Sequence, residues 1–253
     1  MVNNLSKLNI NDIVPNVATI APEAFEAMYI AVRDKEGRLY TNKQVARLPE
    51  IDSGHQYYKE WKMRKHSADR LISFLKKQRR SLDILEVGCG NGWLSAKLAG
   101  IPKAKITGID PNGIEIEQAN RVFKKKNLKF IHGPFNSTSF PEGTQFDVII
   151  FAASIQYFPC IKDVMADAFR LLTSAGRVHV LDTHFYHSGE VEIAAERSKD
   201  YFTSIGFPEM AQYYFHHPLK QVMGLKHKVM FNPTSFLNKI IKRNIFYWIK
   251  IKP

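Results

Sequence analysis

Three glycines at every second position, Gly88, Gly90 and Gly92, are the residues of this sequence that point most clearly to ligand binding. They follow an apolar segment, 83–87, that suits a buried strand, and they precede a segment, 93–98, that suits the first turns of a helix. Glycine lets the backbone adopt positive φ and lets a ligand lie directly against the peptide plane. The helix that begins here would offer unpaired N–H groups to a polar or anionic ligand. The pattern predicts a strand, a ligand-binding turn and a helix; the alternative is a tight turn with only a structural role.

A carboxylate at the end of the next predicted strand adds to this signal. Asp110 ends the segment 105–110 and stands 22 positions after Gly88. A carboxylate at that place can accept hydrogen bonds from both ribose hydroxyls of an adenosyl group. Alternatively, Asp110 caps a helix that begins at Pro111. The dinucleotide fingerprint G-x-G-x-x-G is incomplete, because Trp93 fills the place of its third glycine.

The stretch 85–92, Leu-Glu-Val-Gly-Cys-Gly-Asn-Gly, closely resembles motif I of the class I S-adenosylmethionine (SAM) dependent methyltransferases. The resemblance covers about residues 57–216 and implies SAM as the cofactor and transfer of its methyl group as the reaction. The cofactor-binding residues that it implies are Glu86, Gly88, Cys89, Gly90, Gly92, Asp110, Pro111, Phe135, Asn136, Ala153 and Ser154.

The sequence departs from the family pattern after the third predicted strand. The family usually places an acidic residue there to bind the adenine amino group, whereas this chain has Gly133-Pro134-Phe135-Asn136. Adenine recognition is therefore left to a backbone group, to Asn136 or to apolar contact with Phe135.

Two further segments resemble the parts of small-molecule methyltransferases that face the acceptor. Gln156 and Tyr157 follow the fourth predicted strand, where these enzymes line the methyl-donor pocket. The long helix predicted over 57–77 carries Tyr58, Trp61 and Arg64, and in related enzymes such a helix closes over the cofactor near its carboxylate. The alternative for this helix is that its aromatic side chains pack on the sheet edge.

Neither of two nucleic-acid methylase signatures is present. The motif (Asp/Asn)-Pro-Pro-aromatic of amino-directed methylases is missing after the fourth strand. Cys160 follows Pro159, as the nucleophile of cytosine C5 methylases does, but it lies at a predicted helix start instead of the strand end.

His184, after the fifth predicted strand, is the candidate catalytic residue. Because the sulfonium is already activated, transfer mainly needs an acceptor held in line, and a general base helps only a poor nucleophile such as a hydroxyl. The ordinary pKa of a histidine side chain suits such a base, so His184 is the candidate; a structural or substrate-positioning role is the alternative. No set of His, Cys and carboxylate residues has metal-ligand spacing, so no metal is expected.

The order of apolar segments predicts the fold class. Strands over 105–110, 128–132, 146–151 and 177–182 alternate with helices, which implies a parallel sheet with right-handed crossovers. With the resemblance, this predicts an α/β, Rossmann-like, doubly wound, seven-stranded, mostly parallel sheet with an N-terminal helical extension.

Three segments are expected to form one compact domain: an extension or cap over 1–56, a SAM-binding core over 57–216 and a C-terminal extension over 217–253. In the family a last strand enters antiparallel beside the fifth, and 246–251 alternates and is rich in β-formers, so it is predicted to be that strand. The alternative is a membrane-surface helix over 235–243, with apolar residues on one side and lysines on the other.

Composition narrows the class of protein. The chain has 253 residues, is 45% apolar and carries a formal charge of +12, with no acidic residue after Glu209. Such a basic region can attract nucleic acid, anionic lipid or an acidic substrate, or it can be a solvated surface. Two cysteines make no disulfide framework, so a reducing, cytoplasmic setting is expected. No segment resembles a signal peptide or a transmembrane span.

These observations favour a methyltransferase that acts on a small-molecule acceptor. An RNA methyltransferase that uses the basic C-terminal surface and a non-catalytic SAM-binding module are the alternatives. The sequence does not indicate an oligomeric state.

Overall fold

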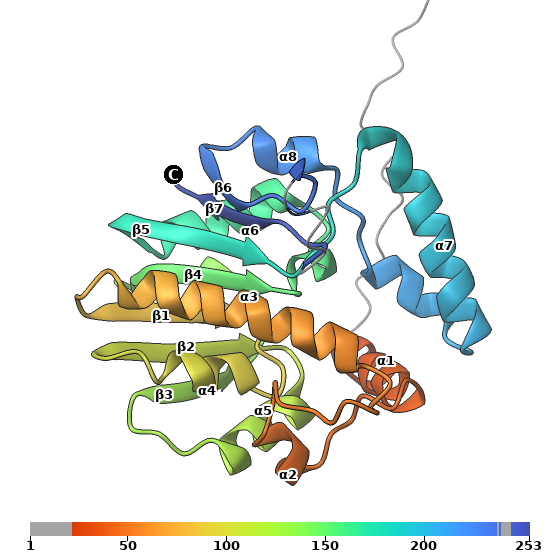
Figure 1. Cartoon of the computed structure of the whole chain (residues 1–253), viewed down its shortest axis with the longest axis horizontal. Coiled ribbons are helices and arrows are strands. Elements are labelled where there is room, and N and C mark those ends of the chain that lie inside the picture. Colours follow the sequence, from red (N-terminus) through yellow and green to blue (C-terminus); the bar gives the residue numbers. More distant parts are fainter. Residues whose placement is uncertain (1–21, 237, 239–243) are drawn as a thin grey trace, which may run out of the picture.

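A computed structural model of the chain describes residues 22–236, 238 and 244–253. Within them, seven strands form one sheet in the order β3-β2-β1-β4-β5-β7-β6 (Figure 1). The strands are β1 (Leu82–Val87), β2 (Ala104–Asp110), β3 (Leu128–His132), β4 (Phe146–Ala152), β5 (Leu172–Leu181), β6 (His227–Phe231) and β7 (Trp248–Ile251). Strand β7 runs antiparallel to its neighbours β5 and β6, and the other pairings are parallel.

Helices cover both faces of the sheet. They are α1 (Pro22–Lys35), α2 (Asn42–Val45), α3 (Tyr58–Lys76), α4 (Trp93–Leu98), α5 (Gly113–Val122), α6 (Ile161–Arg170), α7 (Val191–Ser204) and α8 (Leu219–Met223), with short 3-10 turns η2 (Ser137–Ser139), η3 (Ile155–Tyr157), η4 (Ser188–Glu190) and η5 (Pro208–Tyr213). Helices α3 and α4 pack on one face, and α6 and α8 pack on the other. No helix among the described residues is long and apolar enough to cross a membrane.

The central strands are apolar on both faces because both faces are covered. Ile84 of β1 lies in the core beneath α3 and α4, whereas its neighbour Leu85 lies in the core beneath α6. Ile150 and Ile149 of β4 divide in the same way. Successive side chains of a strand point to opposite faces, so a continuous apolar run is what such a sheet requires.

A third, smaller core joins α1, α7 and η5. Val32, Phe202 and Met210 are its buried members, contributed by these three elements in turn. In Figure 1, α1 and α7 lie at the end of the sheet where the parallel strands finish. We call α1, α7 and η5 the cap. Ligands of parallel α/β sheets bind beyond this end, so the cap lies over the expected site.

The fold prediction is confirmed: the sheet is doubly wound and mostly parallel, and β7 enters antiparallel beside β5. The predicted strand over 246–251 is shorter than expected and begins at Trp248. The proposed membrane-surface helix over 235–243 falls largely outside the described residues.

Some element bounds are set by turns and pairings outside the predicted segments. Helix α1 continues to Lys35, and a left-handed turn follows at Gly37 (φ 66°). Strand β5 begins at Leu172, ahead of the predicted strand over 177–182, and its pairing with β4 is irregular in register near Phe146. Strand β6 has a mixed burial pattern, which gave no strand signal in the sequence.

Candidate active site

Two adjoining cavities lie at the carboxyl ends of the parallel strands. The larger has a volume of about 580 Å³ and the smaller about 180 Å³. Five residues line both of them: Tyr29, Gly88, Gly90, Ala153 and Tyr157. The cavities are therefore two ends of one crevice, which we call the crevice below.

The structure brings most of the predicted site residues to this crevice. The predicted residues that line only the larger cavity are Trp61, Arg64, Glu86, Cys89, Gln156 and His184. Those that line only the smaller cavity are Asp110, Pro111, Phe135 and Ser154, and those that line both are Gly88, Gly90, Ala153 and Tyr157. Tyr58, Gly92 and Asn136 line neither cavity. Gly92 instead forms the N-cap of α4. Tyr58, Gly92 and Asn136 lie outside both cavities, and the roles predicted for them stay predictions.

The glycine turn fits closely between β4 and α5. Gly88 and Gly90 have left-handed φ values of 70° and 50°. A Cβ on Gly88 would lie 2.5 Å from the Ser154 Cβ, and one on Gly90 would lie 2.9 Å from the Glu115 Oε2. Any side chain here would both strain the backbone and collide with these neighbours. The turn therefore leaves its backbone facing the crevice.

Asp110 ties this turn to the end of β2. Its Oδ2 accepts a hydrogen bond from the Gly90 N–H (2.8 Å), and its Oδ1 accepts one from the Asn112 N–H (2.9 Å). Burial raises the pKa of Asp110 to about 6, although these two bonds oppose the rise. The carboxylate is thereby held in a fixed orientation at the smaller cavity, with lone pairs left for a further donor.

Three more buried acids surround the crevice. Burial is the main cause that raises the pKa of Glu86 to about 8, of Glu115 to about 7 and of Asp182 to about 6. Each lines the larger cavity. Desolvation penalises the charged form of each carboxyl, and at Glu115 and Asp182 it outweighs the opposing effect of nearby arginines. A cationic ligand would oppose that penalty.

The smaller cavity is mainly apolar. Phe135 lies edge-on to Phe151 (5.7 Å between ring centroids) and to Phe158 (6.2 Å). The Nδ2 of Asn112 is buried here without a hydrogen-bond partner. Asn136 turns its side chain to η2, where its Oδ1 accepts from the Thr138 N–H (2.9 Å). Of the two side chains considered for adenine contact, only Phe135 reaches the cavity.

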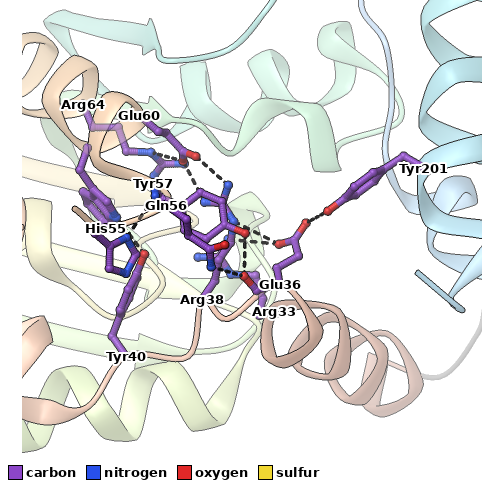
Figure 2. Close-up of polar contacts among 11 residues, drawn as sticks. Arg33, Glu36, Arg38, Tyr40, His55, Gln56, Tyr57, Glu60, Arg64 and Tyr201 are labelled. Carbon is purple, nitrogen blue, oxygen red and sulfur yellow. Dashed lines mark hydrogen bonds and ion pairs between the residues drawn. The ribbon is translucent and has the colours of Figure 1, made fainter. Parts of the chain in front are cut away.

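A cluster of arginines and glutamates closes the α1 end of the larger cavity (Figure 2). Arg38 forms a bidentate pair with Glu60 (3.0 and 2.7 Å), and Arg64 Nε donates to the same carboxylate (3.0 Å). Burial alone would raise the pKa of Glu60, but Arg38 and Arg64 lower it to about 2. Glu36 lies 3.2 Å from the Arg38 Nε and accepts a hydrogen bond from the Tyr201 hydroxyl (2.6 Å).

This arginine cluster carries a surplus of one positive charge. Its ion pairs within 4.0 Å join the guanidinium groups of Arg33, Arg38 and Arg64 to two carboxylates, those of Glu36 and Glu60. Glu115 also acts on Arg33, but burial raises the pKa of Glu115 to about 7. The Nε of Arg33 is buried and has no hydrogen-bond partner among the residues that the structure describes. A buried unpaired donor beside excess positive charge favours an anionic ligand group at this end.

The β4 and β5 ends form the opposite wall. Gln156 is held by two bonds: its Nε2 donates to the Ala153 carbonyl (2.7 Å), and its Oε1 accepts from the Thr183 hydroxyl (3.1 Å). His184 is exposed on the cavity side of the sheet, with its ring 4.4 Å from that of Tyr186. Partial burial lowers the pKa of His184, so the ring is neutral near pH 7. A neutral imidazole can accept a proton from an acceptor held beside it.

Several lining residues gave no clear sequence signal. Tyr29 and Arg33 lie one turn apart on α1, and they line the larger cavity because α1 is part of the cap. Asp182, with φ 56°, accepts from the Ser67 hydroxyl (2.5 Å), which in turn accepts from the Asn244 Nδ2 (2.6 Å). The position of Asp182 at the end of a predicted strand was the one sequence signal for this residue. Among the described residues, no group of three His, Cys, Asp or Glu is placed to hold a metal ion.

Sheet order, glycine turn and crevice are those expected from the resemblance to class I methyltransferases. Residues 84–176 match the family model described as a methyltransferase domain. The match covers residues 84–176, so it is this part of the chain that is similar to a methyltransferase domain.

Individual relatives share only part of this chain. A sterol 24-C-methyltransferase from Gibberella zeae is 32% identical over 99 residues, which are 38% of this chain and 26% of that protein. A malonyl-[acyl-carrier protein] O-methyltransferase from Priestia megaterium is 29% identical over 138 residues, 53% of this chain and 50% of that protein. The matches thus span about a quarter to a half of these relatives.

The fold resemblance extends further than the sequence resemblance. The structure of the plantazolicin methyltransferase BpumL with S-adenosylhomocysteine (SAH) aligns with a TM-score of 0.54 at 16% identity, covering 91% of this chain and 97% of that one. The magnesium protoporphyrin IX methyltransferase from Synechocystis aligns at 0.54 and 13% identity, covering 89% and 100%.

Proposed function

We propose that this protein transfers a methyl group from SAM to a small-molecule acceptor. The observation that carries the proposal is the backbone cradle of Gly88 and Gly90, fixed by Asp110 between two adjoining cavities. The named structures of related fold that contain SAH support the same cofactor.

The residues present fit SAM at both ends of the crevice. In the smaller cavity, Phe135 offers an apolar wall, Asp110 offers acceptors for ribose hydroxyls, and the unpartnered Asn112 Nδ2 offers a donor. In the larger cavity, the surplus guanidinium charge around Arg33 suits the methionine carboxylate. The buried acid Glu86 suits its ammonium group.

When bound, SAM supplies a methyl group already activated by the sulfonium, so the protein needs to hold the acceptor and exclude water. The proposed acceptor site is the part of the larger cavity lined by Gln156 and Tyr157, beneath the cap. For a hydroxyl acceptor, a ring nitrogen of His184 takes the proton. For an amine or a thiolate no base is required.

The crevice supports a small molecule over a polynucleotide. Its larger cavity, about 580 Å³, is lined on one side by residues of α1, α7 and η5. The named relatives act on a sterol and on a carrier-bound malonyl group. A reducing, cytoplasmic setting remains part of the proposal, and the free thiols of Cys89 and Cys160 are compatible with it.

Calorimetry with SAM, SAH and NAD tests the cofactor. We expect micromolar binding of the first two and binding of NAD at least about tenfold weaker. Gly90→Val should abolish SAM binding, whereas Gly54→Ala, in open space, should not change it. Equal affinity for NAD would reject the assignment.

Incubation with methyl-labelled SAM and metabolite extracts then tests transfer. Labelled product in a small-molecule fraction supports the proposed reaction. SAM binding with no labelled product in any fraction would favour the non-catalytic module, and label in RNA would favour the RNA methyltransferase.

A further inference from the structure

The α7 side of the larger cavity carries a cation without an anionic partner. Arg197 of α7 lines the cavity beside Tyr186 and is exposed at its rim. Within the part of the chain that the structure describes, no carboxylate lies within 4.0 Å of its guanidinium, unlike those of Arg38 and Arg64. Glu190 is the acid whose charge acts on neighbouring His184 and Tyr186, and its Oε2 accepts a hydrogen bond from the His187 N–H (3.0 Å).

A row of rings leads from the glycine turn to this arginine. Tyr157, which lines both cavities, lies 5.7 Å from Tyr214, and Tyr214 lies 5.3 Å from His216. His216 lies 5.3 Å from Tyr186, which stands next to Arg197. We call this row the aromatic wall.

The aromatic wall is uncharged near neutral pH. Burial raises the pKa of Tyr186, Tyr157 and Tyr214 and lowers that of His216. Aromatic faces and edges pack well on planar apolar groups. The one formal charge on this side of the cavity, among the described lining residues, is that of Arg197.

On these observations we propose, resting on the proposed function, that the acceptor is a planar aromatic molecule with a carboxylate, and that Arg197 determines this specificity. A guanidinium matches a carboxylate in shape and charge, through two parallel hydrogen bonds. A single guanidinium balances one negative charge, so a carboxylate fits better than a phosphate dianion. The carboxylate of the acceptor binds Arg197 at the rim of the larger cavity, and another group of the acceptor faces the glycine turn.

The test uses the full-length protein saturated with SAH and matched pairs of probes. Binding of 4-hydroxycinnamate is compared with that of 4-hydroxycinnamamide by ligand-observed NMR, with phenyl phosphate as a third probe. We expect the acid to bind at least about tenfold more tightly than the amide. Arg197→Gln should remove this preference. Arg197→Lys should keep part of it, because lysine keeps the positive charge but cannot form two parallel hydrogen bonds with a carboxylate.

Lys199→Gln is the matched control, since Lys199 lies on the same helix, is exposed and does not line the cavity. Lys199→Gln should leave the affinities for both probes and for SAH unchanged. Equal binding of acid and amide, preference for phenyl phosphate, an unchanged preference in Arg197→Gln, or no binding of any probe to the SAH complex would each overturn this inference. Those outcomes leave the proposed function standing. A protein that fails to bind SAH at all would instead refute the proposed function.

Discussion

Replacing Glu86 by glutamine should affect the stability of the ligand-free protein and its affinity for SAM in opposite directions. Glu86 is 3% exposed, lines the larger cavity and accepts a hydrogen bond from the Ser95 hydroxyl. Burial, together with nearby Asp110, raises its pKa from 4.5 to about 8. The folded protein therefore binds this proton more tightly than the unfolded chain does.

The sign and size of the effect follow from this difference. Below pH 4.5 the carboxyl is protonated in both states, and the free energy of unfolding then falls as the pH rises through about 8. At about 1.4 kcal/mol per tenfold difference in proton affinity, the loss is at most about 5 kcal/mol. Glutamine cannot ionise, so Glu86→Gln should raise the free energy of unfolding at pH 8 by about 2–4 kcal/mol.

Urea denaturation at pH 5 and pH 8 measures this effect. The parent protein should lose stability between these values, and Glu86→Gln should lose less. Calorimetry on the same variant should show SAM affinity reduced at least about tenfold, because the partner of the ammonium group is gone. Glu117→Gln, at an exposed position on α5, is the control and should change neither quantity.

Two results would refute the reasoning. One is a Glu86→Gln variant that is less stable than the parent at pH 8, which would mean that the buried group is an ionised, paired carboxylate. The other is unchanged SAM affinity, which would remove Glu86 from the cofactor site.

Three further predictions concern other residues. Asp110→Ala should weaken SAM binding by about 1–3 kcal/mol in calorimetry, since it removes the acceptor that also holds the Gly90 N–H; an unaltered affinity would contradict the ribose role. His184→Ala should lower turnover of a hydroxyl acceptor about 10²–10⁴-fold in a steady-state assay and leave SAM affinity nearly unchanged; a full-rate variant would exclude it as the base. Truncation after Asn244 removes β7 from between β5 and β6, so it should unfold or aggregate the protein in light scattering, and a fully stable truncation would contradict the pairing.

The parts of the site that could be predicted from sequence are those formed by short segments. The glycine turn joins β1 directly to α4, and Asp110 ends the following strand. Their residue types are set by local requirements, which are positive φ, close backbone approach and a strand end. Phe135 could be named but not chosen over Asn136, because the choice depends on which side chain caps η2.

The cap could not be predicted because its contacts join distant parts of the chain. Tyr201 and Glu36 are 165 positions apart, and their hydrogen bond links α7 to the end of α1. Neither residue has a pattern that identifies its partner. Arg33 and Arg197 likewise gave no signal, since a surface arginine and a cavity arginine look alike in sequence.

The arrangement of charge around the crevice gives a physical reason for a preference between SAM and a dinucleotide. Four buried carboxyl groups, those of Glu86, Asp110, Glu115 and Asp182, surround the crevice. A dinucleotide would bring its pyrophosphate to the glycine turn, among these acids. SAM would bring an ammonium and a sulfonium there and place its carboxylate toward the surplus charge near Arg33. Since each acid ionises more readily beside a cation, SAM should bind more tightly as the pH rises from 6 to 8. SAH lacks the sulfonium charge, so its affinity should rise less over the same range, and parallel calorimetric titrations of the two ligands would decide the point.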